Sequence, residues 1–330
     1  MFQKRTLAAL LTAGALFMTG CGSVTPQNRG SSKDQLRIVC TIFPEYDWTK
    51  QILGSHIDEV DLHYVLDSGA DLHSFQPTME DMMMIGDCDL FMYIGGESDE
   101  WTADAIAESV NPQMQTVALL GALGDAAVTE EIREGMQADE EEAEEEGEEE
   151  APEYDEHVWL SVRNAKTLCG VITEKLCQLD SKNAADYREN LAAYTQKLDA
   201  LDQQFQALTD GAQQKTLLFG DRFPFRYFTE DYGLDYYAAF VGCSAETEAS
   251  FETVVFLANK LDELGLDTVY TIESSDGAIA RTIIENTKDK NQQIAVLNSI
   301  QSVTAEQVKS GTTYLSLMQQ NYDVLKAHLK

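Results

Sequence analysis

Residues 187–208 read YRENLAAYTQKLDALDQQFQAL. Apolar residues recur in this segment at alternating intervals of four and three, which places them on one narrow face of a helix about 27 residues and roughly 40 Å long. They are Tyr187, Leu191, Tyr194, Leu198, Leu201, Phe205 and Leu208. Such a stripe is typical of the seam of a coiled coil, and equally of a single long helix that lies across two domains. The segment itself does not separate these two alternatives.

The chain on either side of this helix alternates short apolar runs with helical patterns. Residues 36–42, LRIVCTI, are almost entirely apolar, as in a parallel strand buried on both faces. Strands are predicted at residues 36–42, 60–66, 90–94 and 115–119 before the helix, and at 216–219, 235–240, 268–272 and 295–297 after it. The sequence therefore predicts an α/β fold with two lobes, each a parallel-sheet βα sandwich, joined by one long rigid interlobe helix. The predicted boundaries are 36–180, 181–210 and 211–330.

The N-terminus has the features of an export signal. Lys4 and Arg5 precede an apolar stretch, residues 7–17, that is too short to span a bilayer as a helix. The residues that follow, Met-Thr-Gly-Cys at 18–21, resemble a bacterial lipoprotein cleavage site. We therefore expect a signal peptide at 1–20, a lipidated Cys21 that anchors the chain outside the cytoplasm, and a flexible tether at 21–35. The alternative is an ordinary signal peptide with a coincidental cysteine.

Acidic residues dominate the composition. The chain has 57 acidic and 23 basic residues, a net charge of −34, which repels nucleic acid and anionic lipid headgroups and attracts cations. Ten of the twelve residues Asp139–Glu150 are Asp or Glu. A run of like charge cannot bury itself, so we predict a disordered loop over about 125–156. The loop leads to His157 and is expected to steer cations toward a site rather than chelate them, although a surface insertion without function would look the same.

The cysteines other than Cys21 are odd in number, so at least one of them is unpaired within the chain. Cys169 and Cys177 lie eight residues apart in a predicted helix, hence about 12 Å apart along its axis, beyond the roughly 7 Å that a disulfide can bridge. Most of these cysteines are predicted to be small buried hydrophobic residues.

Four candidate metal ligands follow from the predicted sheets, because ligands of such folds bind beyond the carboxyl ends of the strands. His73 follows a strand of the first half, and His157 opens the helix after the acidic run. Asp221 and Glu273 each follow a strand of the second half. Two imidazole nitrogens and two carboxylate oxygens form a four-coordinate set suited to Zn²⁺ and acceptable to Mn²⁺. Carboxylates in such places also cap helices, and a histidine in a loop is commonly a surface residue.

The segments around both histidines resemble a known family. Residues 69–78, GADLHSFQPT, resemble the Gly-Ala-x-x-His-x-x-x-Pro-Thr segment of the zinc- and manganese-binding lipoproteins of bacterial ABC importers. Residues 157–161, HVWLS, resemble the second ligand segment of these proteins, and the helix at 187–208 resembles their interlobe helix. The resemblance runs in order from about residue 36 to the C-terminus. It implies that His73 and His157 bind metal.

Two departures from the family pattern bear on the other two ligands. Arg222 stands where the family usually has His or Glu, so the resemblance shifts that role to the neighbouring Asp221. Asn298 stands where manganese-binding members have Asp, which favours Glu273, used at about that place by some zinc-binding members.

The function implied by the resemblance is high-affinity capture of a divalent metal outside the cytoplasm and its delivery to an ABC importer permease. Zinc is the expected metal and manganese the alternative, and a monomer that does not bind nucleic acid is expected. An adhesin or interaction lipoprotein on the same scaffold is a further alternative. An exported metallohydrolase is the least favoured, because the chain lacks both Gly-x-Ser-x-Gly and His-Glu-x-x-His.

Overall fold

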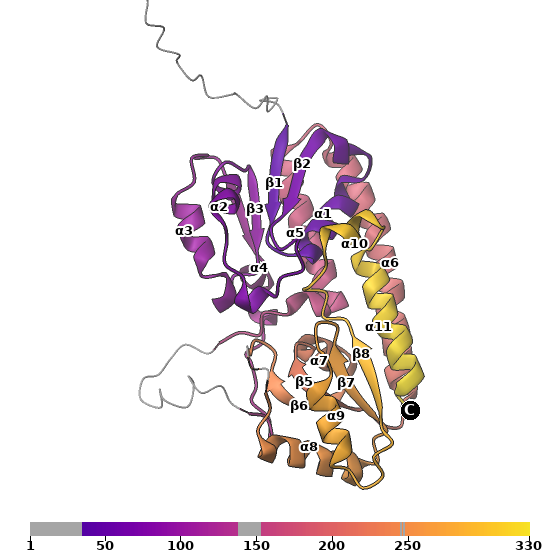
Figure 1. Ribbon diagram of the computed structural model, residues 1–330. Helices are drawn as coiled ribbons and strands as arrows, with labels where there is room; N and C mark the ends of the chain where they lie inside the picture. The colour runs from indigo at the N-terminus through magenta and orange to yellow at the C-terminus, as the bar shows by residue number, and fades with distance from the viewer. Residues whose placement is uncertain (1–34, 138–152, 245, 247) are drawn as a thin grey trace, which may run out of the picture. The chain divides into compact units, whose positions relative to one another are not determined.

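The computed structural model describes residues 35–137, 153–244, 246 and 248–330. Residues 36–330 form one unit that contains two four-stranded parallel sheets and a long helix (Figure 1). The predicted signal peptide, Cys21 and the acidic run 139–150 lie outside the described residues, so these remain predictions.

The first sheet has the strand order β2-β1-β3-β4, and every neighbouring pair is parallel. Its strands are β1 Leu36–Cys40, β2 Val60–Tyr64, β3 Leu90–Tyr93 and β4 Gln115–Ala118, and its helices are α1 Phe43–Leu53, α2 Met79–Gly86, α3 Trp101–Ala107 and α4 Leu119–Leu123. The helix α2 begins with a capping box between Thr78 and Asp81.

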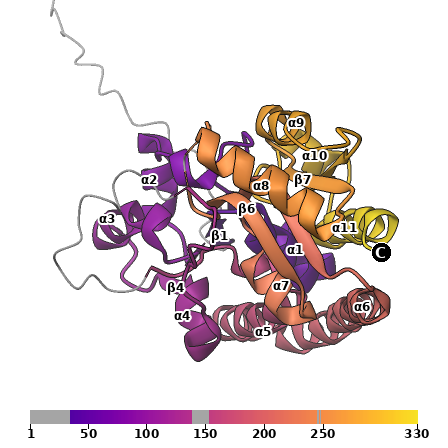
Figure 2. The same ribbon diagram turned by 90° about the horizontal axis from the view of Figure 1, so that it is seen from below.

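The second sheet repeats this arrangement with the order β6-β5-β7-β8, again all parallel. Helices α8 and α9 lie on one side of it and α7 on the other (Figure 2). The strands are β5 Thr216–Phe223, β6 Asp235–Val241, β7 Thr268–Ile272 and β8 Gln293–Leu297, and the helices are α7 Arg226–Tyr232, α8 Phe251–Leu264, α9 Ala278–Glu285, α10 Ala305–Lys309 and α11 Tyr314–His328.

One strand differs from its prediction. We expected β5 to end at Phe219, but it continues to Phe223, with an irregularity in its pairing with β6 between Phe219 and Arg222. The Gly220-Asp221 pair in this stretch is typical of a turn and therefore predicts an end of the strand at Phe219. Because the strand continues, Asp221 is held inside it rather than in the loop that follows.

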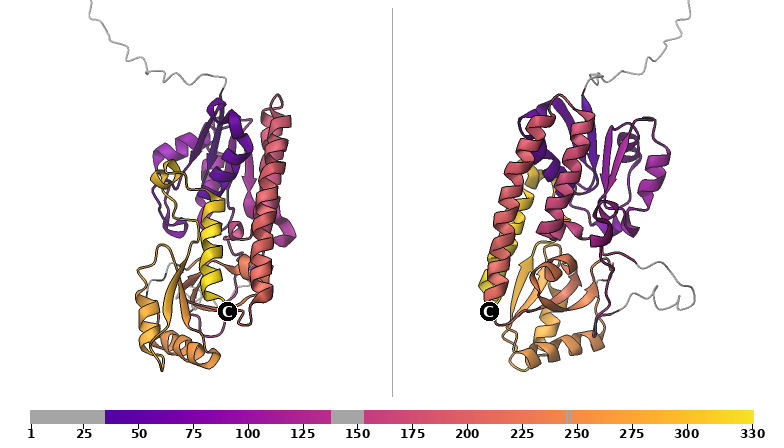
Figure 3. Two further views of the ribbon diagram at one scale, coloured as in Figure 1. Left: turned by 90° about the vertical axis from the view of Figure 1, so that its right-hand side faces the viewer. Right: turned by 180° about the vertical axis from the view of Figure 1, so that it is seen from behind.

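The long helix α6, Ala184–Gly211, follows α5, Val162–Leu179, and touches both lobes (Figure 3). Near its start, Asn190 Nδ2 donates to the Ile52 carbonyl of the first lobe at 2.9 Å. Farther along, Asp202 Oδ1 accepts from Tyr232 Oη of the second lobe, also at 2.9 Å. Five of the seven predicted stripe residues are buried. The helix therefore joins the lobes within one chain, and the coiled-coil alternative is wrong.

Helix α11 is a second connection between the lobes. It packs on β8 and beside α6 (Figure 3), and Tyr322 lies 5.6 Å from the ring of Phe205. At its start, the Tyr314 amide donates to Asp47 of the first lobe at 2.9 Å. Two helices thus tie the lobes together, which limits how far the lobes can move apart.

The residues flanking the acidic run form the base of a hairpin. The Glu130 amide donates to the Glu153 carbonyl and the Asp155 amide to the Val128 carbonyl, each at 3.0 Å. Tyr227 of α7 donates its hydroxyl to the Asp155 carbonyl at 2.8 Å. These flanks, predicted as parts of one long loop, are built into the fold.

All the described cysteines are free thiols. Cys40, Cys88, Cys169 and Cys177 are buried, as predicted for small hydrophobic residues, whereas Cys243 is partly exposed. Among the described residues, no helix has the length and apolar character needed to cross a membrane.

The burial of α6 can be tested by truncation. Phe205 is fully buried between Phe228, Tyr232 and Tyr322, so Phe205→Ala should lower the free energy of unfolding by about 3–5 kcal/mol. Gln203→Ala, on the exposed face of the same helix, should change it by less than about 0.5 kcal/mol. Urea unfolding of the metal-free protein measures both, and equal losses would contradict the packing of this helix.

Candidate metal centre

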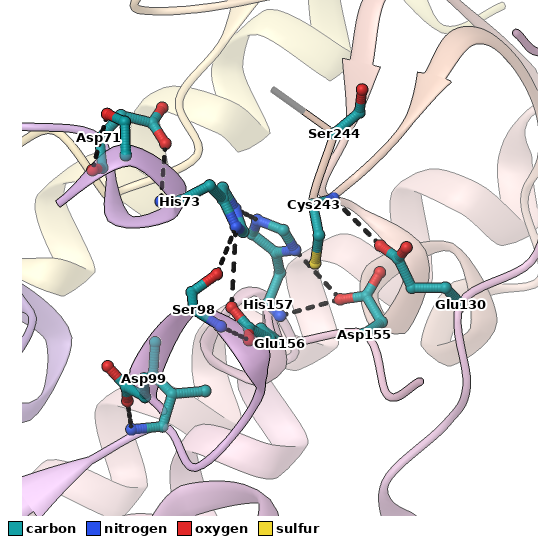
Figure 4. A network of polar contacts seen from close by, with 12 residues as sticks. Asp71, His73, Ser98, Asp99, Glu130, Asp155, Glu156, His157, Cys243 and Ser244 are labelled. Atoms are coloured by element: carbon teal, nitrogen blue, oxygen red, sulfur yellow. Dashed lines mark hydrogen bonds and ion pairs between the residues drawn. The ribbon is translucent and has the colours of Figure 1, made fainter. Parts of the chain in front are cut away.

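Two histidines face each other between the lobes. The Nε2 atoms of His73 and His157 are 3.2 Å apart, although the residues are 84 positions apart in the chain (Figure 4). His73 lies in the 3-10 turn Leu72–Ser74, which follows β2. His157 directly precedes the 3-10 turn Val158–Leu160, which leads into α5. The structure thus brings together the two histidines that the sequence singled out.

The His73 ring is held from behind by Ser98 and Glu156. Its Nδ1 is 2.7 Å from Ser98 Oγ and 3.7 Å from Glu156 Oε2. Glu156 is fixed in turn, because its Oε1 accepts from the Ser98 amide at 2.8 Å. This packing requires a glycine at Gly96, where a Cβ atom would lie 2.2 Å from Glu156 Oε1. Burial raises the pKa of Glu156 to about 7.

The His157 ring is completely buried and is oriented by Asp155. The same oxygen, Asp155 Oδ1, accepts from the His157 amide at 2.8 Å and lies 3.1 Å from its Nδ1. The end of β6 packs against the ring. A Cβ atom at Gly242 would lie 3.1 Å from the ring and 2.9 Å from the Phe223 carbonyl oxygen, so the backbone approaches this closely only because residue 242 is glycine.

The partner of His157 assigns the tautomer of that ring. A carboxylate can only accept, so Nδ1 of His157 carries the proton and its Nε2 carries a lone pair. The Ser98 hydroxyl behind Nδ1 of His73 can accept or donate, so His73 Nε2 either donates a hydrogen bond to His157 Nε2 or carries a second lone pair. Burial, and secondarily the charge of His157, lower the pKa of His73 to about 3, so this ring is neutral at physiological pH. A neutral imidazole binds a cation through the nitrogen that carries the lone pair, so a metal between the rings would take both Nε2 atoms as ligands and leave the protons on Nδ1.

A third ligand atom lies beside the two rings. Among the described residues, one group of three or more His, Cys, Asp or Glu has its ligand atoms within 4.8 Å of one another, and it consists of His73, His157 and Cys243. Cys243 follows β6, and its amide donates to Glu130 Oε1 at 3.0 Å (Figure 4). Sequence reasoning missed it by treating the cysteines as core residues. The rule that selected Glu273, a ligand type just past a strand end, would have found it.

The two predicted carboxylates are not part of this group. Asp221 accepts from the Arg222 amide at 2.9 Å and from the Ile272 amide at 3.3 Å, which joins β5 to the end of β7. Glu273 accepts from the amide and hydroxyl of Ser299 at 2.7 and 2.9 Å. Metal binding by either carboxylate stays a prediction.

An acidic cavity of about 740 Å³ opens beside His73. Its charged lining residues are Asp71, Asp221, Arg222, Glu246, Glu248 and Asp276. His157 does not line the cavity, so a cation that enters there meets His73 first. The acidic lining lowers the energy of a cation in the cavity.

Arg222, which departs from the family pattern, forms an ion pair across the lobes. Its guanidinium pairs with Asp71, whose Oδ1 also accepts from the His73 amide at 3.0 Å. Its Nη1 also donates to the Ser244 carbonyl at 3.3 Å. Arg222 therefore supports the turn that carries His73 instead of supplying a ligand.

Two α/β lobes, a rigid helix across them and ligand atoms gathered between them define a class, the two-lobed solute-binding proteins. The chain belongs to the ZnuA family, the periplasmic component A of zinc-uptake complexes, whose family model matches residues 38–328.

Several known proteins are similar over most of the chain. The high-affinity zinc uptake system protein ZnuA of Bacillus subtilis is 29% identical over 330 residues, which cover 100% of this chain and 99% of that protein. The zinc-binding lipoprotein AdcA of Streptococcus pneumoniae is 28% identical, but the chain spans only 61% of its length. The Zn(II)-bound structure of the ZnuA-like domain of that AdcA superposes with a TM-score of 0.68, at 25% identity, over 89% of this chain and 99% of that domain.

A more distant structure supports the fold alone. The periplasmic zinc-binding protein TroA of Treponema pallidum superposes with a TM-score of 0.70 at 22% identity over 89% of this chain and 99% of that chain. The predicted α/β fold with two lobes and an interlobe helix is confirmed. Family membership also confirms the predicted class: the protein is a zinc-binding component of an ABC uptake complex, in a family of solute-binding proteins and not of enzymes.

The lowered pKa of His73 predicts how stability depends on pH. The unfolded chain takes up a proton near the ordinary pKa of about 6.5, whereas folded His73 does so only near pH 3, so stability falls as the pH drops below about 6.5. Between pH 7.5 and pH 5, protonation of His73 in the unfolded chain should lower the free energy of unfolding of the metal-free protein by about 2 kcal/mol.

Urea unfolding gives the free energy of unfolding of metal-free wild type and His73→Gln at both pH values. The loss between pH 7.5 and pH 5 should be about 2 kcal/mol greater in wild type than in the variant. His63→Gln, at an exposed histidine, is the matched control and should behave as wild type. Equal losses in wild type and His73→Gln would contradict the lowered pKa.

Proposed function

We propose that the protein captures Zn²⁺ outside the cytoplasm with His73 and His157 and delivers it to the permease of an ABC importer. In this proposal it acts as a monomer anchored to the cell membrane through lipidated Cys21, and its strong negative charge keeps nucleic acid away. Its similarity to zinc-uptake proteins along the whole chain supports the zinc assignment. Manganese is less suited, because imidazole nitrogen favours zinc.

One observation carries the proposal, the 3.2 Å separation of the two Nε2 atoms. Zinc–nitrogen bonds of 2.0–2.1 Å at a tetrahedral angle place two nitrogens about 3.3 Å apart. The rings are therefore spaced as a tetrahedral zinc ion requires. Oxygen partners behind both Nδ1 atoms fix the rings and raise their basicity, as around many zinc ions in proteins.

The second lobe would supply the remaining ligands, and Asp221 and Glu273 are our candidates from the sequence. Asp221 lines the same cavity as His73. In each of these carboxylates, each oxygen accepts one hydrogen bond. To bind zinc, an oxygen must either use its second lone pair or give up its hydrogen bond. Carboxylate oxygens are acceptable zinc ligands at about 2.0–2.2 Å.

Replacing either histidine tests the site. His73→Ala and His157→Ala should each weaken Zn²⁺ binding by more than about 100-fold, since loss of even an outer partner of a metal ligand commonly costs 10–100-fold. Equilibrium titration of the full chain with a competing chelator measures this. Wild type should bind one zinc ion tightly without turning over any substrate, and His63→Ala should bind as wild type does. Full affinity in both site variants would refute the proposed site.

The carboxylate role can be tested with two residues that line the same cavity. Asp221→Asn should weaken Zn²⁺ binding far more than Glu246→Gln, because only Asp221 is proposed to touch the metal. Both changes remove one negative charge from the cavity, so a long-range electrostatic effect would appear equally in the two variants. The opposite order would reassign the carboxylate ligand.

A further inference from the structure

Cys243 differs from the other described cysteines in its surroundings. Cys40, Cys88, Cys169 and Cys177 are buried, whereas Cys243 is partly exposed and stands at the end of β6. Its sulfur lies with the two imidazoles. Burial, and then the neighbouring carboxylates of Glu130, Asp155 and Glu156, raise the pKa of its thiol, so the thiolate forms only when a cation binds. In Figure 4 the sulfur points toward His157, from the opposite lobe.

The position of the sulfur fits a metal ligand. The sulfur and one nitrogen of each imidazole lie within 4.8 Å of one another. Around a tetrahedral zinc ion with Zn–S near 2.3 Å and Zn–N near 2.0–2.1 Å, sulfur and nitrogen would be about 3.6 Å apart. The limit of 4.8 Å exceeds this spacing by about 1 Å, so a rotation of the Cys243 side chain or a small approach of the lobes would bring the sulfur to bonding distance.

The backbone around Cys243 is fixed. Glu130 Oε1 accepts from the Cys243 amide at 3.0 Å, and Glu130 itself belongs to the hairpin base beside the acidic run. Gly242 lets the preceding backbone pack against the His157 ring. The sulfur is thus placed by the same contacts that position His157, so it does not depend on a freely moving loop.

The second lobe has no metal ligand at the position where the family resemblance places one, and this supports the same assignment. Arg222, at the place where the resemblance to metal-binding lipoproteins expected a ligand, is paired with Asp71 and the Ser244 carbonyl. The first lobe supplies two nitrogen ligands, and a zinc site needs donors from the second lobe to bridge the two. Among the described residues of that lobe, Cys243 is the one that forms, with both histidines, a group of ligand atoms within 4.8 Å of one another.

We propose that Cys243 is the third protein ligand of the captured zinc ion, binding as a thiolate from the second lobe, and that it makes the site selective for zinc over manganese. This inference rests on the proposed function of His73 and His157. On metal binding the thiol loses its proton to solvent and the sulfur lone pair forms the bond to zinc. One carboxylate, for which Asp221 in the cavity beside His73 is the first candidate and Glu273 the second, then completes the four-coordinate site.

Selectivity follows from the nature of the donor atom. Thiolate and imidazole ligands favour zinc, whereas manganese favours carboxylate, carbonyl and water oxygens. Replacing the sulfur by a hydroxyl should therefore weaken zinc binding more than manganese binding. A site built from nitrogen and oxygen alone would show no such asymmetry.

Cobalt(II) is the probe for the thiolate, because a cobalt–thiolate bond gives a charge-transfer absorption in the near ultraviolet. The full chain should show this band at one equivalent of Co²⁺. Cys243→Ser should lose the band, bind Zn²⁺ more than about 100-fold more weakly, and lose much of the preference for Zn²⁺ over Mn²⁺. Cys177→Ser, at a buried cysteine of α5, is the matched control and should keep all three properties.

A second measurement does not depend on any variant. Zinc K-edge X-ray absorption of the wild-type zinc form should show one sulfur at about 2.3 Å among nitrogen and oxygen neighbours. Tight binding of zinc with no sulfur neighbour and no cobalt–thiolate band would overturn the role of Cys243 and leave the histidine site standing. Failure of wild type to bind zinc at all would instead overturn the proposed function, and the inference with it.

Discussion

The structure depends on one constraint, the facing of two buried imidazoles through their Nε2 atoms at 3.2 Å. Their pairing requires that both Nδ1 atoms have partners behind them, which Asp155, Ser98 and Glu156 provide. It also requires backbone close to the His157 ring and to the Glu156 side chain, which explains the glycines at 242 and 96. These contacts hold the two Nε2 atoms at a separation that suits a bound zinc ion before any metal arrives.

The long helix holds the second lobe, with its candidate ligands, opposite the two imidazoles. The imidazoles come from the first lobe, and the remaining candidate ligands, Cys243, Asp221 and Glu273, come from the second. Helices α6 and α11 both connect the lobes, so the two halves of the site approach each other in a nearly fixed relation. A site closed by small shifts loses little conformational entropy on binding, which favours high affinity.

The sequence predicted the framework well, because hydrophobic periodicity reports it directly. The stripe from Tyr187 to Leu208, the buried strands and the two histidines follow from periodicity, the strand-end rule and family motifs. It did not reveal the extension of β5 past Gly220-Asp221, since turn residues there are overridden by pairing with β6. It also failed to separate Cys243 from the core cysteines, because that distinction depends on which residues converge from distant parts of the chain. The same reason left the Arg222–Asp71 ion pair unseen.

The hairpin base beside the acidic run has a consequence for how such proteins can diverge. Backbone hydrogen bonds join Glu130 to Glu153 and Val128 to Asp155, and the Gln137 amide donates to the Ala239 carbonyl of β6 at 2.9 Å. The chain therefore stays attached to the second lobe as far as Gln137 and is clamped again just before His157. A change of chain length that is to leave His157 in place has to fall between these two attachments, where each doubling of a flexible loop costs only about 0.6 kcal/mol in closure entropy.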